Sequence, residues 1–97
     1  MLRPDVSRRA TRDLRDIWIY IARDDRAAAD RMQSELREAI DRLCDFPQIG
    51  HIRDDLTPRP LLFWTVHPYL IAYQRQGRRL RVVRVVHGKR DLGSLFR

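Results

Sequence analysis

The sequence predicts an α+β domain: an N-terminal two-helix hairpin packed on one face of a small antiparallel β-sheet, which consists of a short edge strand and a three-stranded meander. Two amphipathic segments, 7–23 and 26–45, fill the first half of the chain, and three apolar segments separated by short turns follow. Such helices need a surface to cover, and the sheet needs one face covered. Ninety-seven residues hold one core of this kind, so we expect residues 1–97 to form a single domain.

The first helix is expected to begin at about Ser7. Residues 2–6 precede it as a short strand, in which Pro4 favours an edge position. Ser7 is a good N-cap, because its hydroxyl can accept a hydrogen bond from an N–H of the first turn. An apolar stripe follows at helical spacing: Ala10, Leu14, Ile17, Trp18 and Ile21. Ile19 and Tyr20 fall outside the stripe, so this helix has apolar surface left over.

The second helix is expected over residues 26–45. Asp24 and Asp25 interrupt the first apolar stripe, and either residue can cap the new helix. Its own stripe consists of Ala29, Met32, Leu36, Ala39, Ile40 and Leu43. Phe46-Pro47 ends the helix, because the residue before a proline disfavours helical backbone. The short connection between the helices predicts an antiparallel hairpin.

The second half of the chain predicts a loop followed by a meander. Residues 47–60 contain three prolines, Gly50 and two adjacent aspartates, which is typical of a loop. Three apolar strands joined by tight turns follow: 61–66, 69–75 and 79–87. Consecutive strands with short turns pair in antiparallel order.

The last strand is the most apolar segment, with four valines and one leucine in the seven positions 80–86. By alternation, Leu80, Val82 and Val86 fall on one side and Val83 and Val85 on the other. A strand that is apolar on both faces is usually interior in its sheet. We expect six side chains to lie in the core: Trp18, Leu36, Leu43, Tyr73, Val83 and Val85.

The net charge of +7 is concentrated in one part of the chain. Residues 59–97 hold eight arginines and Lys89 against a single acidic residue, Asp91, and so carry a net charge of +8. A surface this basic attracts acidic partners such as nucleic acid or an acidic protein segment. A solvated basic face that serves only solubility is the alternative.

The remaining composition excludes several classes of protein. No apolar run is long enough to span a bilayer, no signal peptide opens the chain, and the single cysteine, Cys44, fits a core position. His51, His67 and His87 lie far apart in the sequence, without the spacing of a metal site. We therefore expect a cytoplasmic protein with no membrane segment, no metal and no cofactor.

One cluster could carry chemistry, namely His87 with Arg84, Lys89 and Arg90. A histidine base beside arginines that stabilise a pentavalent phosphate would suit RNA cleavage by attack of the 2′-hydroxyl. The alternative is structural. His87 would then be a strand-end histidine bonded to backbone, and Arg84 would lay its stem on the sheet and pair with a helix carboxylate.

The order of motifs along the chain resembles the ParE/RelE superfamily of bacterial toxins. Two helices are followed by Phe46-Pro47-x-x-Gly50, Tyr69-Leu-Ile-x-Tyr73 and Arg84-Val-x-His87-Gly-x-Arg90-Asp91. The opening helix, Asp13-Leu-Arg-Asp-Ile-Trp-Ile-Tyr-Ile-Ala22, looks like the ParE branch in particular. The resemblance covers nearly the whole chain, and the motifs are specific through their order and spacing rather than singly.

The resemblance implies one of two activities. RelE-like members are ribosome-dependent endoribonucleases that cut messenger RNA, and ParE-like members poison DNA gyrase. Aligned with RelE, this chain has Leu61 and Phe63 at the two lysine positions, Leu70 at an arginine position and Phe96 at the tyrosine position; only Arg90 remains. Leucine and phenylalanine can neither transfer a proton nor balance a phosphate charge. A non-enzymatic gyrase poison is therefore favoured.

The resemblance also implies partners and contact residues. We expect a ParD-like antitoxin to hold the toxin inactive in a hetero-oligomer, through an acidic amphipathic segment that touches Ile19, Tyr20, Arg75 and Arg81. We expect gyrase, or DNA bound to it, to be contacted by Lys89, Arg90, Leu92, Leu95 and Phe96. The alternatives are a ribonuclease with His87, Arg90 and Arg84 as its active site, and an inert or repurposed binding module.

Overall fold

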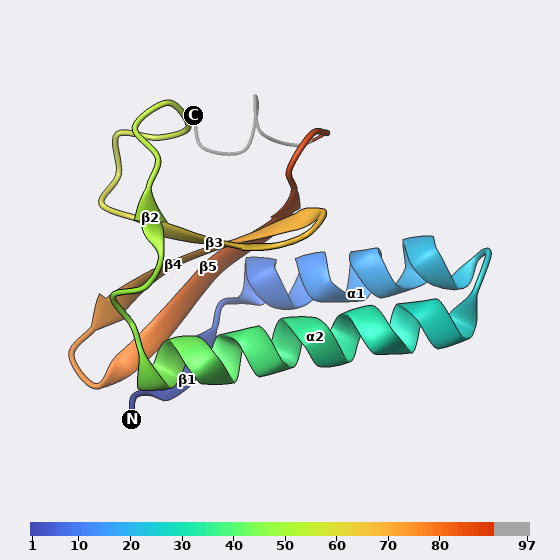
Figure 1. Ribbon diagram of the computed structural model, residues 1–97, viewed down its shortest axis with the longest axis horizontal. Coiled ribbons are helices and arrows are strands. Elements are labelled where there is room, and N and C mark those ends of the chain that lie inside the picture. The colour runs from blue at the N-terminus through green and yellow to red at the C-terminus, as the bar shows by residue number, and fades with distance from the viewer. Residues whose placement is uncertain (91–97) are drawn as a thin grey trace.

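The computed structural model of the protein describes residues 1–90. Its elements follow in the order β1 (Arg3–Val6), α1 (Arg8–Ala22), α2 (Arg26–Asp45), β2 (His51–Ile52), β3 (Leu62–Val66), β4 (Tyr69–Gln76) and β5 (Arg79–His87). The two helices lie side by side along one face of the sheet (Figure 1), so the expected α+β fold class is confirmed. None of the helices in this described part is long and apolar enough to cross a membrane.

Both helices begin at the caps that the sequence predicts. Ser7 Oγ accepts a hydrogen bond from the N–H of Ala10 at 3.0 Å, and Asp25 Oδ1 accepts one from the N–H of Ala28 at 3.1 Å. These bonds satisfy N–H groups that the first turn of a helix leaves without an intrahelical partner. Only residues 23–25 join the helices, which confirms the antiparallel hairpin.

The sheet is mixed rather than antiparallel throughout. Its strand order is β1-β5-β4-β3-β2, and β3, β4 and β5 form the expected antiparallel meander. β1 is an edge strand as expected, but it runs parallel to β5. In addition, β2 lies within the expected loop and pairs with the start of β3. A two-residue strand is too short to carry the alternation by which strands are predicted.

The main core lies between the helices and the sheet. The sheet contributes Tyr69, Ile71, Tyr73, Leu80, Val82 and Val85 to it, and the helices contribute their apolar stripes. Leu36 and Leu43 of α2 are fully buried in this core, as expected. Cys44 is buried beside them, and burial, together with two nearby carboxylates, raises the pKa of its thiol.

Tyr73 ties the loop after α2 to the sheet. Its hydroxyl donates to the carbonyl of Pro47 at 2.8 Å and accepts from the N–H of Gly50 at 2.9 Å. Burial raises the pKa of Tyr73, and the bond from Gly50 partly offsets this rise. A Cβ atom at position 50 would collide with the Tyr73 hydroxyl and ring, so only glycine fits there. The motif from Phe46 to Gly50 therefore has a packing function.

A β-bulge in β5 breaks the expected alternation of its side chains. Ala72 lies opposite Arg84, whereas the next residue of β4, Tyr73, lies opposite Val82. β5 therefore has one extra residue, Val83, between these two pairs. The extra residue shifts the facing of every side chain that follows it in the strand.

The bulge corrects the expected facing of two valines. Val85 joins Leu80 and Val82 on the helix side, while Val86 faces the other side of the sheet. There it belongs to a second buried cluster made of Leu61, Phe63, Leu70, Ala72 and Val86. Val83 packs at the margin of this second cluster and is only partly buried, so its expected place in the core was wrong.

Trp18 is the second expected core residue that is not in the core. It is only partly buried, and it contacts α2 at the boundary of the helix pair instead of joining the main core. Its indole Nε1 donates to Asp30 Oδ1 at 2.8 Å, and the Arg26 guanidinium lies 5.9 Å from its ring centroid. An indole that needs a partner for its N–H is well placed at such a boundary.

Candidate functional site

A cleft of about 310 Å³ lies between α1 and the end of β5. Basic, acidic and aromatic side chains share its walls: Arg9, Asp13, Asp16, Ile17, Tyr20, Tyr69, Arg84, Val85, His87 and Arg90. The cleft brings together the three residues of the ribonuclease hypothesis with Tyr20, which we expected to contact the antitoxin. It is therefore the candidate functional site.

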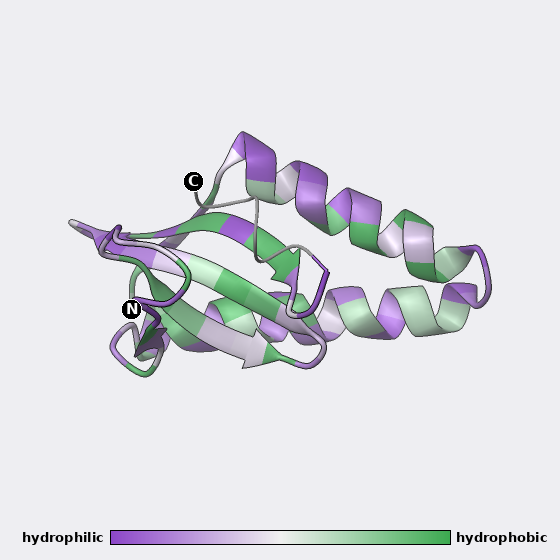
Figure 2. Cartoon of the chain, turned by 90° about the horizontal axis from the view of Figure 1, so that it is seen from above, coloured by the Kyte–Doolittle hydropathy of each residue, from purple (hydrophilic) through white to green (hydrophobic). Residues whose placement is uncertain are grey.

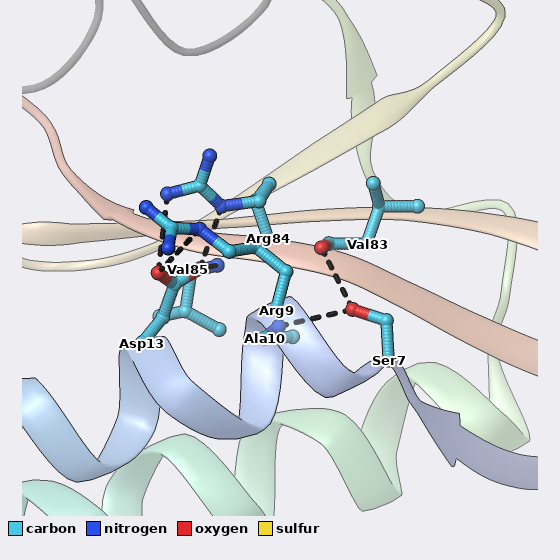
Figure 3. Close-up of polar contacts among 7 residues, drawn as sticks. All are labelled: Ser7, Arg9, Ala10, Asp13, Val83, Arg84 and Val85. Atoms are coloured by element: carbon cyan, nitrogen blue, oxygen red, sulfur yellow. Dashed lines mark hydrogen bonds and ion pairs between the residues drawn. The ribbon is translucent and has the colours of Figure 1, made fainter.

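Asp13 of α1 holds the first wall of the cleft together. It is only 7% exposed, and its carboxylate accepts from Arg84 Nε and Nη2 at 2.8 and 3.1 Å (Figure 3). The backbone N–H of Val85 donates to the same carboxylate at 3.0 Å. Arg9 lies one helical turn earlier on α1, with its Nε 3.8 Å from Asp13. The expected pairing of Arg84 with a helix carboxylate is thus confirmed.

Ser7 fixes the start of α1 against the bulge. Its hydroxyl donates to the carbonyl of Val83 at 2.9 Å, and its N–H donates to the carbonyl of Val82 at 3.0 Å. The same hydroxyl caps the helix, so one side chain joins the helix start to the irregular part of β5 (Figure 3). The carbonyl of Val83, the extra residue of the bulge, is in this way satisfied by a side-chain donor.

His87 is bonded to the turn that follows β5. Its Nδ1 accepts from the N–H groups of Lys89 and Arg90 at 3.1 and 3.3 Å. The imidazole also meets the Tyr69 ring edge-on, at a centroid distance of 5.5 Å. Because Nδ1 is an acceptor in both bonds, the neutral ring carries its proton on Nε2. His87 is thus a strand-end histidine bonded to backbone, the contact that the structural alternative expected.

Arg90 and Tyr20 meet at the open side of the cleft. The guanidinium carbon of Arg90 lies 4.5 Å from the centroid of the Tyr20 ring, within the range of a cation–π interaction. Tyr20 nevertheless remains 53% exposed, and its neighbour Ile19 is 42% exposed. The cleft therefore presents an accessible cation and an aromatic ring together, and Ile19 adds exposed aliphatic surface next to Tyr20 on α1. This combination suits an acidic side chain that is flanked by apolar ones.

The other expected contact residues lie elsewhere. Lys89 is exposed in the turn beside Arg90. Arg75 and Arg81 lie at the opposite end of the sheet, near the turn between β4 and β5, so the structure does not place them beside Ile19 and Tyr20. Three expected target contacts, Leu92, Leu95 and Phe96, lie outside the described residues.

The positions that resemble the RelE catalytic site lie on the other side of the sheet. Leu61, Phe63 and Leu70 converge there in the second buried cluster, which is apolar throughout. Arg90, the one matching residue, lies over Tyr20 of α1 rather than over this cluster. Within residues 1–90, no three His, Cys, Asp or Glu side chains are grouped to hold a metal ion.

Sequence reasoning did not identify Asp13, Arg9 or Tyr69 as parts of the site. The sequence did contain one signal for the site. Asp13 lies three residues after Ala10 and four before Ile17, so it falls within the apolar stripe of α1. A carboxylate on the buried face of a helix needs a partner. The sequence supplied a basic candidate in Arg84, but the distance between the two residues in the chain concealed the pair.

Comparison with known proteins finds similarity to toxins, both in a family model and in individual relatives. The family model described as the ParE toxin of the type II toxin–antitoxin system parDE matches residues 5–92. The toxin RelE2 of Caulobacter vibrioides is 35% identical over 82 residues, which cover 84% of this chain and 90% of that protein. Y4kP of Sinorhizobium fredii, also named as a toxin, is 34% identical over 79 residues, with coverages of 81% and 80%.

A solved structure has the same fold. A chain of the chromosomal ParDE toxin–antitoxin system from P. aeruginosa superimposes with a TM-score of 0.73 at 19% sequence identity. The match covers 90% of this chain and 96% of that chain. At this identity the likeness concerns the fold.

Proposed function

The chain belongs to the ParE toxin family of type II toxin–antitoxin systems, and on this premise we propose that it is a poison of DNA gyrase held inactive by a ParD-like antitoxin. The proposal includes one toxin domain over residues 1–97, action in the cytoplasm where gyrase works, and no catalysis by the toxin itself. The alternative that the superfamily offers is a ribosome-dependent endoribonuclease.

The observation that carries the proposal is the apolar cluster of Leu61, Phe63 and Leu70. In the resemblance to RelE, these positions hold the cationic side chains of the ribonuclease site. Here the three side chains are almost fully buried against one another and against Val86. None of them can donate a proton or stabilise a phosphate. An activity based on binding needs no such groups.

The ribonuclease alternative has one observation in its favour, the meeting of His87, Arg84 and Arg90 in one cleft. Two features weaken it. Arg84 is engaged by the buried carboxylate of Asp13, which neutralises the charge that a phosphate would need. His87 Nδ1 accepts two backbone N–H groups, and the protonated Nε2 of the neutral ring cannot act as a base.

The cleft also supports the antitoxin part of the proposal. An acidic amphipathic segment would place a carboxylate on Arg90 and apolar side chains on Tyr20 and Ile19. These two apolar side chains are too exposed to contribute to the folding core. A flexible segment that orders on binding gains affinity from such combined contacts.

The deciding experiment pairs two assays on the purified chain. We expect inhibition of supercoiling by DNA gyrase, its reversal by the product of the neighbouring antitoxin gene, and no cleavage of ribosome-bound messenger RNA. Cleavage of the messenger without any effect on supercoiling would establish the ribonuclease instead.

A further inference from the structure

Five arginines gather at the end of the sheet that is far from the cleft. They lie around the turn between β4 and β5 and on the adjoining edge strand: Arg3, Arg75, Arg78, Arg79 and Arg81, here named the hairpin face. β5 separates this face from His87 by eight residues, a distance of about 26 Å in an extended strand. Figure 2 shows hydrophilic residues at this end of the molecule. The hairpin face is thus separate from the site described above.

Strand register places part of this face on the side of the sheet opposite to the helices. Leu80 and Val82 face the helices, so Arg79 and Arg81, which alternate with them, face away. Arg3 is the partner of Arg79 on β1, and on β4 the partners of Arg79 and Arg81 are glutamines. The helices do not cover this side.

Charge on the hairpin face is poorly balanced. Asp5 is the one acidic residue in register with it, at 2.9 Å from Arg81 and 3.9 Å from Arg79. Within residues 1–90, no ion pair involves Arg3, Arg75 or Arg78. Arg3 lies directly opposite Arg79 on a neighbouring strand, at a Cα separation of about 5 Å. Like charges placed opposite each other destabilise a sheet, and a bound polyanion would relieve that repulsion.

The side-chain chemistry of the hairpin face favours nucleic acid over an acidic protein as its ligand. Protein partners bind mainly through buried aromatic or aliphatic anchors. Apart from Met1, the exposed large apolar side chains in residues 1–90 belong to other elements: Ile19 and Tyr20 to α1, Phe46 to the end of α2 and Ile52 to β2. Phosphate contacts require only accessible cationic donors, and arginine supplies a planar fork that matches a phosphate.

From these observations we propose that the hairpin face binds the phosphate backbone of double-stranded DNA without reading its bases. A toxin that acts on gyrase would meet duplex DNA bound to that enzyme. The choice of DNA over RNA as the ligand therefore rests on the proposed function. DNA binding would hold the toxin near its target and would not depend on the cleft.

The test measures fluorescence anisotropy of two labelled DNA duplexes of unrelated sequence, with the full chain and without gyrase. The test variant replaces Arg3, Arg78 and Arg79 with glutamine. The matched control replaces three exposed arginines of the helix hairpin with glutamine: Arg23, Arg31 and Arg37. Both variants change the net charge equally, and circular dichroism melting confirms that each is folded.

We expect both duplexes to bind wild-type protein equally, with a steep dependence on salt between about 50 and about 200 mM. The hairpin variant should flatten the slope of log K against log salt by about three units and lower affinity at ~0.1 M salt by roughly 100-fold. The helix variant should change both quantities much less.

Four results would overturn the proposal: no binding of duplex DNA, equal losses in both variants, tighter binding of duplex RNA, or preferential binding of a polyglutamate peptide to the hairpin face. The experiment contains no gyrase. A failure of the gyrase hypothesis would therefore appear in the supercoiling assay and leave the anisotropy result unchanged.

Discussion

Asp13 and Arg84 are joined by two hydrogen bonds across 71 positions of sequence, and both side chains are largely buried. The carboxylate lies on the inner face of α1, and the guanidinium comes from the bulged part of β5. Because the same carboxylate also accepts the N–H of Val85, one aspartate aligns the helix with the strand that ends at the cleft. The pair therefore connects the fold with the candidate site.

Replacing Asp13 with alanine should lower the free energy of unfolding by roughly 3–5 kcal/mol, because it leaves Arg84 largely buried without its partner. The asparagine variant should lose less, since it keeps one acceptor oxygen. Urea denaturation followed by circular dichroism measures both losses. Asp16→Ala, at an exposed position three residues away, is the matched control. Equal effects of the Asp13→Ala and Asp16→Ala variants would contradict the role given to the pair.

Leu36→Ala should destabilise the protein by about 2–5 kcal/mol, because this fully buried leucine leaves a cavity between α2 and the sheet. For a domain of this size, the melting temperature should fall by at least about 8 °C. Thermal melting of the variant beside Glu35→Ala, an exposed neighbour, tests this. A shift of about a degree for Leu36→Ala would mean that its burial contributes little.

Tyr73→Phe should remove two hydrogen bonds from the loop after α2 and lower stability by roughly 1–3 kcal/mol near neutral pH. Burial raises the pKa of Tyr73, so the fold favours the neutral phenol. The contribution of this phenol is complete below the ordinary tyrosine pKa of about 10 and is lost as the pH rises through the higher folded value.

The stability difference between wild-type protein and Tyr73→Phe should therefore shrink in alkaline solution. Urea denaturation at several pH values on either side of about 10 measures it. The other tyrosines and Cys44 are present in both proteins, so they do not contribute to this difference in stability. A difference that stays constant, or grows with pH, would contradict the assigned cause.

The double variant Ile19→Ser, Tyr20→Ser should bind the antitoxin more weakly without loss of folding, since both side chains are largely exposed. Isothermal titration calorimetry with the purified antitoxin measures the affinity, and thermal melting checks the fold. Ile52→Ser removes a more accessible apolar side chain, 66% exposed, on the edge strand β2 and serves as control. Unchanged affinity of the double variant would place the antitoxin elsewhere.

Arg90→Ala should abolish inhibition of supercoiling, because it removes the accessible cation that lies over Tyr20. His87→Ala should leave ribosome-bound messenger RNA uncut, as with the wild-type chain. Both variants are compared in the same supercoiling and messenger-cleavage assays. If the wild-type chain cuts messenger and His87→Ala does not, His87 and Arg90 form a catalytic site and the gyrase hypothesis fails.

The sequence by itself determined the features that depend on local spacing. The cap at Ser7, a cap at Asp24 or Asp25, the apolar stripes apart from Trp18 and the meander are set by residues a few positions apart, and the structure confirms them. The need of Arg84 for a partner could also be predicted from its neighbours in the sequence, because an arginine between valines of an interior strand must find an acceptor. Leucine and phenylalanine at four positions of the RelE site likewise needed no structure to be recognised.

Only the tertiary structure decided which distant groups meet. The parallel pairing of β1 with β5, the two-residue β2, the bulge at Val83 and the choice of Asp13 as partner of Arg84 all involve residues far apart in the chain. Periodicity reports which side chains share a face, but backbone pairing fixes register, and one extra residue in a strand reverses the facing of all that follow. For that reason Val85 faces the helices and Val86 faces the other side of the sheet. The cleft, in which Arg90 meets Tyr20, exists only because α1 is anchored along β5.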